Sequence, residues 1–144
     1  MMIAICGSLS FAYEMKDLSE RLKKLGFEVE SPVTAARIID GEITLDEIKR
    51  EKETGAFSKR SIQADAIRRY HRIIKDADTV LVANFEKNGL KGYIGGNAFL
   101  EMGFSHVMNK PIYLLHQIPD MAYKDEIAAM QPIVIEGDLS RIAK

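Results

Sequence analysis

The chain has 144 residues, of which 47% are apolar and 28% are charged, and its net charge is −1. This composition is typical of a globular protein, and the length suits one domain that buries roughly two-thirds of its unfolded surface. A net charge so close to zero argues against a nucleic-acid polymer or an anionic membrane as the main partner.

The expected compartment follows from the apolar runs and the cysteine content. No apolar run approaches the ~18 residues that span a bilayer, and the first residues have the pattern of a strand rather than of a signal peptide. Cys6 is the only cysteine, so no internal disulfide can form. We therefore expect a cytoplasmic protein.

The first thirty residues have the pattern of a βαβ unit. Residues 1–6 form a short apolar run, which is typical of a strand covered on both faces. Gly7 and Ser8 end this run, a helical pattern follows over residues 11–25, and residues 27–30 form a second candidate strand. Gly7 and Ser8 are interpreted either as a simple turn or as an anion-accepting loop at the end of the first strand.

The middle of the chain is less regular. Residues 33–57 show only one clear element, a short charged helix that starts at the capping-box residue Thr44 and stops near Gly55. We expect this helix to be a solvated surface element, with a lid or a subunit contact as the alternative. Residues 58–77 are predicted to form one longer helix, with a core-facing stripe of Ile62, Ala66, Tyr70, Ile73 and Ala77.

Two interpretations concern the side chains of that longer helix. Arg68, Arg72 and Lys75 occupy a different face, for which solvation is favoured over phosphate binding. Tyr70 lies on the apolar stripe, so core packing is its first explanation, but its hydroxyl needs a hydrogen-bond partner and a ligand could supply one.

The second half alternates short apolar runs with helical patterns. Residues 79–83 form a central strand, and a polar loop over residues 84–91 leads into a helix that starts near Gly96 and ends at Asn109, before Pro111. The remaining elements are strands at 112–115 and 132–135, a short helix at 122–130 and a terminal helical turn at 139–143. Five apolar strands separated by helices predict a single α/β domain, a doubly wound parallel sheet of flavodoxin-like order with helices on both faces.

The glycine-rich segment after the central strand is the strongest candidate site. A strand, a glycine loop and a helix in this order direct unpaired N–H groups at the crevice beyond the strand. Gly95 and Gly96 allow the backbone to approach a ligand closely, because no Cβ is in the way. Glu101 follows about one turn into the helix, where the positive end of the helix dipole favours a carboxylate.

Several other chemistries lack their motifs. The sequence has no paired CxxC, HExxH, acidic calcium loop, GxxxxGK[ST], GxSxG, or GxGxxG after its first strand. His71, His106 and His116 are far apart and lack metal-ligand spacing, so each is interpreted as a packed or surface residue. We expect neither a metal nor another cofactor.

After these exclusions, the remaining candidate site is the carboxylate of Glu101 with the glycine loops at residues 7–8 and 95–97. Carboxylates attack anomeric carbons, where the transition state resembles an oxocarbenium ion, and a nearby anion site could hold a substrate phosphate. The pattern therefore raises the hypothesis of N-glycosidic chemistry on a small-molecule nucleoside or nucleotide. A binding domain without turnover is the alternative.

Three segments resemble the nucleoside 2-deoxyribosyltransferase superfamily, which includes the 2'-deoxynucleoside 5'-phosphate N-hydrolases: residues 5–8, residues 77–78 and residues 97–104. The match covers most of the chain in element order, although only the two loops are specific. The resemblance implies a flavodoxin-like fold and makes Glu101 the nucleophile that attacks C1' and forms a glycosyl-enzyme. It further implies that the sugar and its 5' end are lined by Gly7, Ser8, Gly95 and Asn97, with Gly96 between the last two.

The sequence departs from this family at two positions. The family often has an aspartate that assists the leaving base where Tyr70 stands here, beside His71, so either of these residues is a candidate proton donor. True nucleoside transferases tend to have a carboxylate six residues before the nucleophile, where this chain has Gly95. A carboxylate repels a 5'-phosphate, whereas glycine leaves room and an N–H donor. These departures favour nucleoside 5'-monophosphates over nucleosides, and hydrolysis over transfer.

Further candidates lie near the loops. Phe11, Tyr13 and Tyr93 are interpreted as core or surface residues, with base stacking as the sharper hypothesis. Ser8 and Ser10 are candidates for binding phosphate through their hydroxyls.

The remaining alternatives concern function and assembly. A nucleoside 2-deoxyribosyltransferase and a catalytically silent nucleotide sensor both stay open, and a phosphoribohydrolase of the cytokinin-activating type ranks below them because its glycine signature is longer. The resemblance also implies a homodimer or higher homo-oligomer in which a neighbouring subunit completes the pocket.

Overall fold

A computed structural model describes residues 1–144. It has a five-stranded sheet, all parallel, in the order β2-β1-β3-β4-β5. The strands are β1 (Met2–Cys6), β2 (Glu28–Glu30), β3 (Thr79–Val82), β4 (Ile112–Leu114) and β5 (Ile133–Val134). The prediction of a doubly wound sheet with flavodoxin-like order is therefore confirmed.

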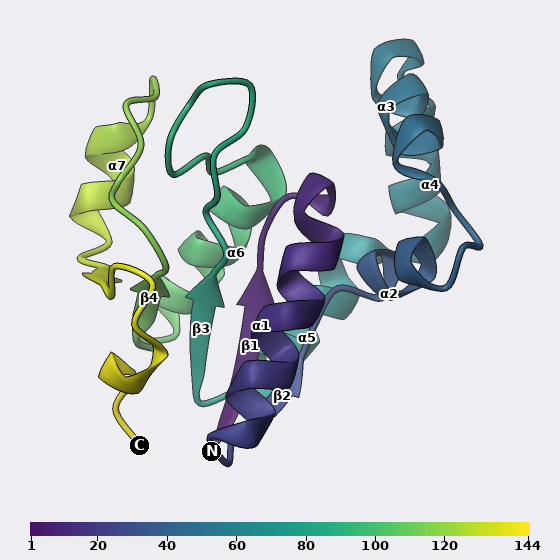
Figure 1. Cartoon of the computed structure of the whole chain (residues 1–144). Helices are drawn as coiled ribbons and strands as arrows, with labels where there is room; N and C mark the ends of the chain where they lie inside the picture. The colour runs from purple at the N-terminus through teal and green to yellow at the C-terminus, as the bar shows by residue number, and fades with distance from the viewer.

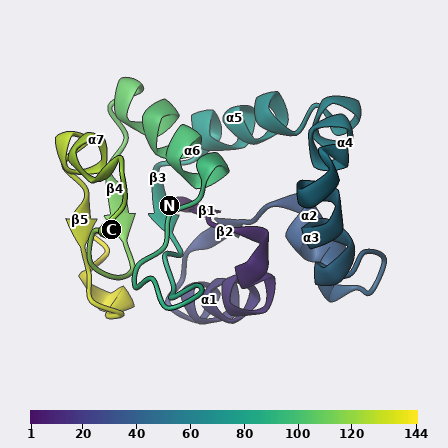
Figure 2. The ribbon, with the colours of Figure 1, turned by 90° about the horizontal axis from the view of Figure 1, so that it is seen from above.

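Helices cover both faces of this sheet (Figures 1 and 2). They are α1 (Ala12–Lys24), α2 (Val33–Ile39), α3 (Leu45–Thr54), α4 (Ala56–Ala64), α5 (Ala66–Asp76), α6 (Gly96–Val107) and α7 (Lys124–Ala129), with 3-10 turns at Leu9–Phe11 and Leu139–Arg141. None of the helices is long and apolar enough to cross a membrane.

Alternation along β1 explains why its residues are all apolar. Ile3 and Ile5 belong to the core under α1 and α2, whereas Ala4 and Cys6 belong to the core under α5, α6 and α7. Successive side chains of a strand point to opposite faces, so a strand covered on both sides needs apolar residues at every position. Cys6 consequently points toward α6, the helix that begins at the glycine-rich loop.

Residues 33–64 contain more helix than predicted. The capping box of Thr44 is confirmed, since Glu47 N donates to Thr44 Oγ1 at 3.1 Å and Thr44 N donates to Glu47 Oε2 at 3.2 Å. Gly55 ends α3 with a φ of 80°. The sequence pattern missed α2, a two-turn helix without a capping side chain. Helices α3 and α4 pack against each other and stand apart from the sheet (Figure 1); we call residues 45–64 the arm.

The prediction of one helix over residues 58–77 is wrong. The chain breaks between α4 and α5 at Asp65, whose φ of 49° and ψ of 43° are left-handed. Ile62 is 77% exposed and so lies off the core stripe, whereas Tyr70 and Ala77 are buried. Apolar spacing cannot reveal this break, because Asp is one of the few residues that tolerates a left-handed conformation without glycine or proline as a signal.

Asn84 joins the end of β3 to two loops. Its side chain is fully buried, and Nδ2 donates to the carbonyls of Gly92 at 3.4 Å, His116 at 3.0 Å and Gln117 at 3.1 Å. In return, His116 N donates to Asn84 Oδ1 at 2.9 Å. One amide thus fixes the start of the segment that leads to the glycine loop.

We expect Asn84→Ala to lower the free energy of unfolding by about 2–4 kcal/mol, because buried backbone groups lose their partners. Urea denaturation measures this change. Asn97→Ala is the matched control, since Asn97 is exposed and its loss should change stability by less than about 0.5 kcal/mol. Equal stability of the Asn84 and Asn97 variants would contradict the role of Asn84.

Candidate functional site

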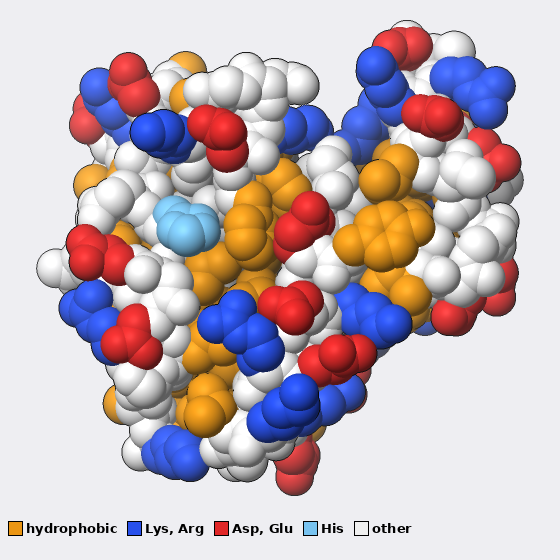
Figure 3. Space-filling view, in the orientation of Figure 1, with side chains coloured by type: hydrophobic (Ala, Val, Ile, Leu, Met, Phe, Trp, Pro, Cys, Tyr) orange, Lys and Arg blue, Asp and Glu red, His pale blue; other side chains and the backbone are white.

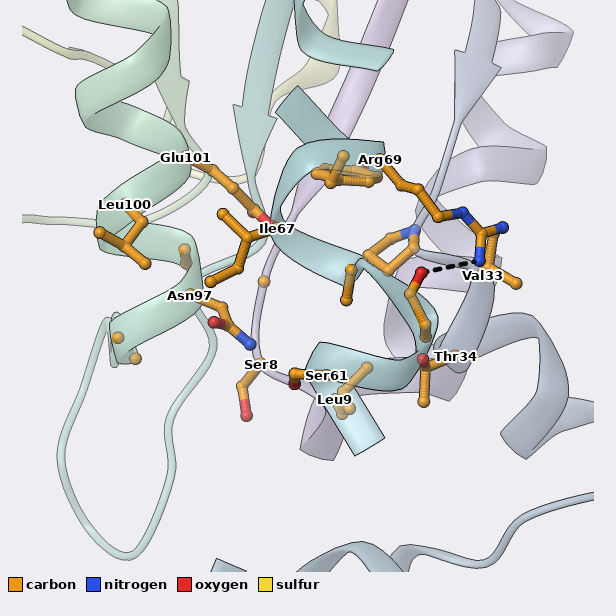
Figure 4. A pocket seen from close by; sticks show the side chains of 18 of the residues that line it. Ser8, Leu9, Val33, Thr34, Ser61, Ile67, Arg69, Asn97, Leu100 and Glu101 are labelled. Carbon is orange, nitrogen blue, oxygen red and sulfur yellow. Dashed lines mark hydrogen bonds between the residues drawn. The ribbon is translucent and has the colours of Figure 1, made fainter. Parts of the chain in front are cut away.

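A pocket of about 180 Å³ lies beyond the carboxyl ends of β1 and β3. These strands meet at the point where the chain winds outward in opposite directions, which is where α/β sheets bind ligands. The pocket is bordered by the loop after β1, the start of α6, one face of α5, the start of α2 and the arm (Figure 4). It therefore brings together most of the residues expected at the site: Gly7, Ser8, Tyr70, Tyr93, Gly95, Gly96, Asn97 and Glu101.

Glu101 reaches from α6 into this pocket (Figure 4). Its Oε2 atom is sealed from solvent and has no hydrogen-bond partner within the chain. Burial disfavours the charged carboxylate and raises the pKa of Glu101 to about 8, although a hydrogen bond with the Cys6 thiol opposes part of that shift. The free protein at neutral pH therefore holds Glu101 mostly in its protonated form.

Two buried side chains lie close to this carboxyl. Cys6 is fully buried, and burial, the charge of Glu101 and their hydrogen bond together raise the pKa of its thiol. Tyr70 is 7% exposed, and its hydroxyl donates to the carbonyl oxygen of Ile5. Burial, followed by the charges of Cys6 and Glu101, raises the pKa of Tyr70 well above its ordinary value. Both groups therefore keep their protons at neutral pH.

The start of α6 presents free backbone donors to the pocket. Gly95 precedes the helix in an extended conformation, and no side chain caps it. The first backbone bond runs from Phe99 N to Gly95 O at 2.9 Å, so the preceding N–H groups of the first turn have no partner within the helix. Ser8 lies on the same pocket, and its Oγ accepts from Ser10 N at 3.3 Å. This rim is suited to an anion.

Four basic side chains of the pocket were not among the residues predicted for the site. Arg37, Lys52, Arg60 and Arg69 all line it. Arg37 pairs with Glu42 at 2.9 Å and Arg60 pairs with Glu51, whereas Arg69 makes no ion pair and donates only to the carbonyl of Ala64 at 3.4 Å (Figure 4). Arg69 and Lys52 therefore provide the pocket with two positive charges that no carboxylate neutralises.

A signal for Arg69 was present in the sequence. Arg69 stands three residues after Ala66 and four before Ile73, so it shares their side of α5, and all three line the pocket. The stripe that predicted a core face thus faces a cavity over part of its length. The contributions of α2 and the arm had no such signal, because they depend on how distant segments pack.

Four candidate residues do not line the pocket: Ser10, Phe11, Tyr13 and His71. Phe11 is buried and packs edge-on against Phe85, with ring centroids 5.4 Å apart. Tyr13 is 57% exposed and borders a separate, more open hollow. His71 packs edge-on against Phe104, with centroids 5.1 Å apart. Ser10 contributes its backbone N–H to Ser8.

The pocket combines a buried carboxyl group, a rim of backbone donors and cationic side chains. Such a site is suited to an anionic ligand with an electrophilic carbon near the carboxyl group. No protein-family model matches this sequence, and no curated protein matches it either. A proposal of function therefore starts from the geometry of the pocket.

Proposed function

We propose that this chain is an N-glycosidase that hydrolyses the base–sugar bond of a nucleoside 5'-monophosphate, with Glu101 as the nucleophile. The observation that carries the proposal is the Oε2 atom of Glu101, which is buried without a partner inside a pocket rimmed by backbone donors. Burying a carboxyl oxygen that has no hydrogen-bond partner has a free-energy cost, and such costly buried groups are characteristic of functional sites. The resemblance to the nucleoside 2-deoxyribosyltransferase superfamily supports the same assignment.

The proposed reaction has two steps. A Glu101 carboxylate oxygen forms a bond with C1' while the bond from C1' to the base nitrogen breaks, and the base leaves with the electron pair and takes up a proton. Water then attacks C1' as the bond from C1' to Glu101 breaks. The sugar phosphate leaves with the hydroxyl, the carboxylate is restored, and the proton lost by water balances the one taken up by the base. The nucleophile must be ionised, so the raised pKa of Glu101 makes its deprotonation part of the cycle.

The rim of α6 supports a phosphorylated substrate. In this proposal its free N–H groups donate hydrogen bonds to a 5'-phosphate, and Gly95 has no side chain that would exclude one. A Cβ at Gly95 would lie 3.3 Å from the Tyr93 ring, which shows how closely this backbone is packed beside that ring. A carboxylate side chain at this position would add both crowding and repulsion.

The leaving-group side of the pocket supports a second candidate, a nucleotide-binding domain without turnover. Tyr70 donates its hydroxyl proton to the Ile5 carbonyl, and His71 does not line the pocket. Neither residue is therefore placed to protonate a departing base. If binding alone is the function, nucleotides will stabilise the protein thermally without forming any product.

A panel of ribo- and deoxyribonucleoside monophosphates tests the proposal directly. Each is incubated with the protein, and free base is separated by chromatography. Release of base from at least one monophosphate is expected, and no release from any of them refutes the glycosidase. Adding a second free base to the active reaction distinguishes hydrolysis from transfer, because a transferase would form a new nucleotide.

We expect Gly96→Ala to raise the KM for the monophosphate by about tenfold, because a methyl group would enter open space at the rim where the phosphate approaches. Steady-state kinetics measures this effect. Gly103→Ala is the matched control: it lies on the same helix, its new methyl also meets nothing, and it does not line the pocket. Equal KM values for the two variants would contradict binding at the rim.

A further inference from the structure

Two aromatic rings at the edge of the pocket each hold a lysine. Phe57 of the arm and Tyr93 of the loop before α6 both line the pocket. Lys52 Nζ lies 5.0 Å from the centroid of the Phe57 ring, and Lys87 Nζ lies 4.8 Å from that of Tyr93. Both ammonium groups are therefore held beside the pocket by cation–π contacts.

These two lysines have no anionic partner in the chain. Neither takes part in any salt bridge. The rings that hold them line the same pocket, and burial first, then the charge of Lys87, lower the pKa of Lys52. Two like charges beside one pocket repel each other, and an anion bound between them would relieve that repulsion.

The lysines lie next to the proposed phosphate rim. Tyr93 borders Gly95, the residue just before α6, and the same ring holds Lys87. The arm holds Lys52 on the other ring, and Figure 3 shows the arm separated from the body of the molecule by a notch with basic side chains along it. A ligand anchored at α6 would extend past Tyr93 toward this notch.

We propose that Lys52 and Lys87 form a second anion site that binds the outer phosphate of a ligand with two linked phosphates, such as a nucleoside 5'-diphosphate. The inner phosphate lies at the start of α6, and this placement rests on the proposed function. Binding of the outer phosphate also joins the arm to the loop before α6. The site requires no turnover, so it extends the ligand class beyond monophosphates.

Pyrophosphate is the probe for this site, because it carries two linked phosphates and no base. Isothermal titration calorimetry compares the full chain with Lys52→Met, Lys87→Met and the double variant. Methionine keeps the length of the stem and removes the charge. Each single variant should bind pyrophosphate about tenfold more weakly, and added salt should weaken binding to the unaltered protein.

Two controls separate a specific site from general charge. Lys49→Met removes a charge from an exposed position on the same helix as Lys52 and should leave the affinity unchanged. Lys87→Arg keeps the charge and should retain binding. Absence of pyrophosphate binding to the unaltered protein, or an equal loss in Lys49→Met, overturns the proposal, as does unchanged affinity in the double variant.

The same titrations separate this proposal from the glycosidase. Glu101→Gln should bind pyrophosphate as the unaltered protein does, because the carboxyl group is not part of the anion site. If base release fails while the lysine variants lose affinity, only the glycosidase falls. If base release occurs while the lysine variants bind normally, only the second anion site falls.

Discussion

Replacing Glu101 by glutamine is expected to lower kcat for base release by at least about a thousandfold, because the amide cannot form the glycosyl-enzyme. Glutamine is nearly isosteric, so the pocket should keep its shape and its affinity for nucleotide. Single-turnover release of free base measures the effect, and thermal shift with the same nucleotide verifies binding. Glu20→Gln removes a carboxylate from an exposed position of α1 and should retain full activity.

Two further measurements define the role of Glu101 in that reaction. Mass spectrometry of the quenched reaction should detect a glycosyl group on the unaltered protein and none on the glutamine variant. The nucleophile must be ionised, and the pKa of Glu101 in the ligand-free protein is about 8. We therefore expect kcat/KM to rise with pH up to about 8 and then to level off. Base release that survives in Glu101→Gln, or kcat/KM that is independent of pH in this range, would rule out the nucleophile.

The second large effect expected is a pH dependence of the free energy of unfolding that comes from Glu101. Glu101 has a pKa near 4.5 when unfolded and about 8 in the folded protein, so between these values the folded state holds a proton that the unfolded state has lost. The contribution of Glu101 to stability should therefore fall as pH rises, by about 1.4 kcal/mol per pH unit and by at most about 5 kcal/mol in total. Below pH 4.5 both states are protonated and the penalty disappears.

The glutamine variant should escape this penalty, because its side chain does not titrate. Urea denaturation of both proteins from pH 4 to 9 should show the variant gaining stability relative to the unaltered protein up to about pH 8, with a constant difference above it. Glu20→Gln should show no such divergence. A difference between Glu101→Gln and the unaltered protein that stays flat across the range would mean that Glu101 is not desolvated.

Together, these two expected effects describe a trade of stability for activity at one residue. A carboxyl group that weakens the fold at neutral pH and is required for turnover would connect the burial of Oε2 to its function. Loss of activity without the pH-dependent gain in stability would indicate a nucleophile that is hydrated in solution. The reverse result would indicate a buried acid with no role in catalysis.

Much of the fold and part of the site could be predicted from the sequence. The strands β1 and β3 were visible as continuous apolar runs, because a strand covered on both faces must be apolar at every position. The parallel order followed from the alternation of such runs with helices. Glu101 and the glycine loops were identified because ligands of an α/β sheet bind beyond the carboxyl ends of its strands, which depends on chain order alone.

What only the tertiary structure decided depends on contacts between distant segments. The break at Asp65 redirects the chain, so that the arm borders the pocket and contributes Lys52 and Arg60. Lys52 and Lys87 are 35 positions apart, yet the rings that hold them line one pocket, and no local pattern predicts this. The pKa of Glu101 is likewise set by desolvation among packed elements. Local periodicity records which side of an element is buried, whereas charge placement and desolvation depend on what packs against it.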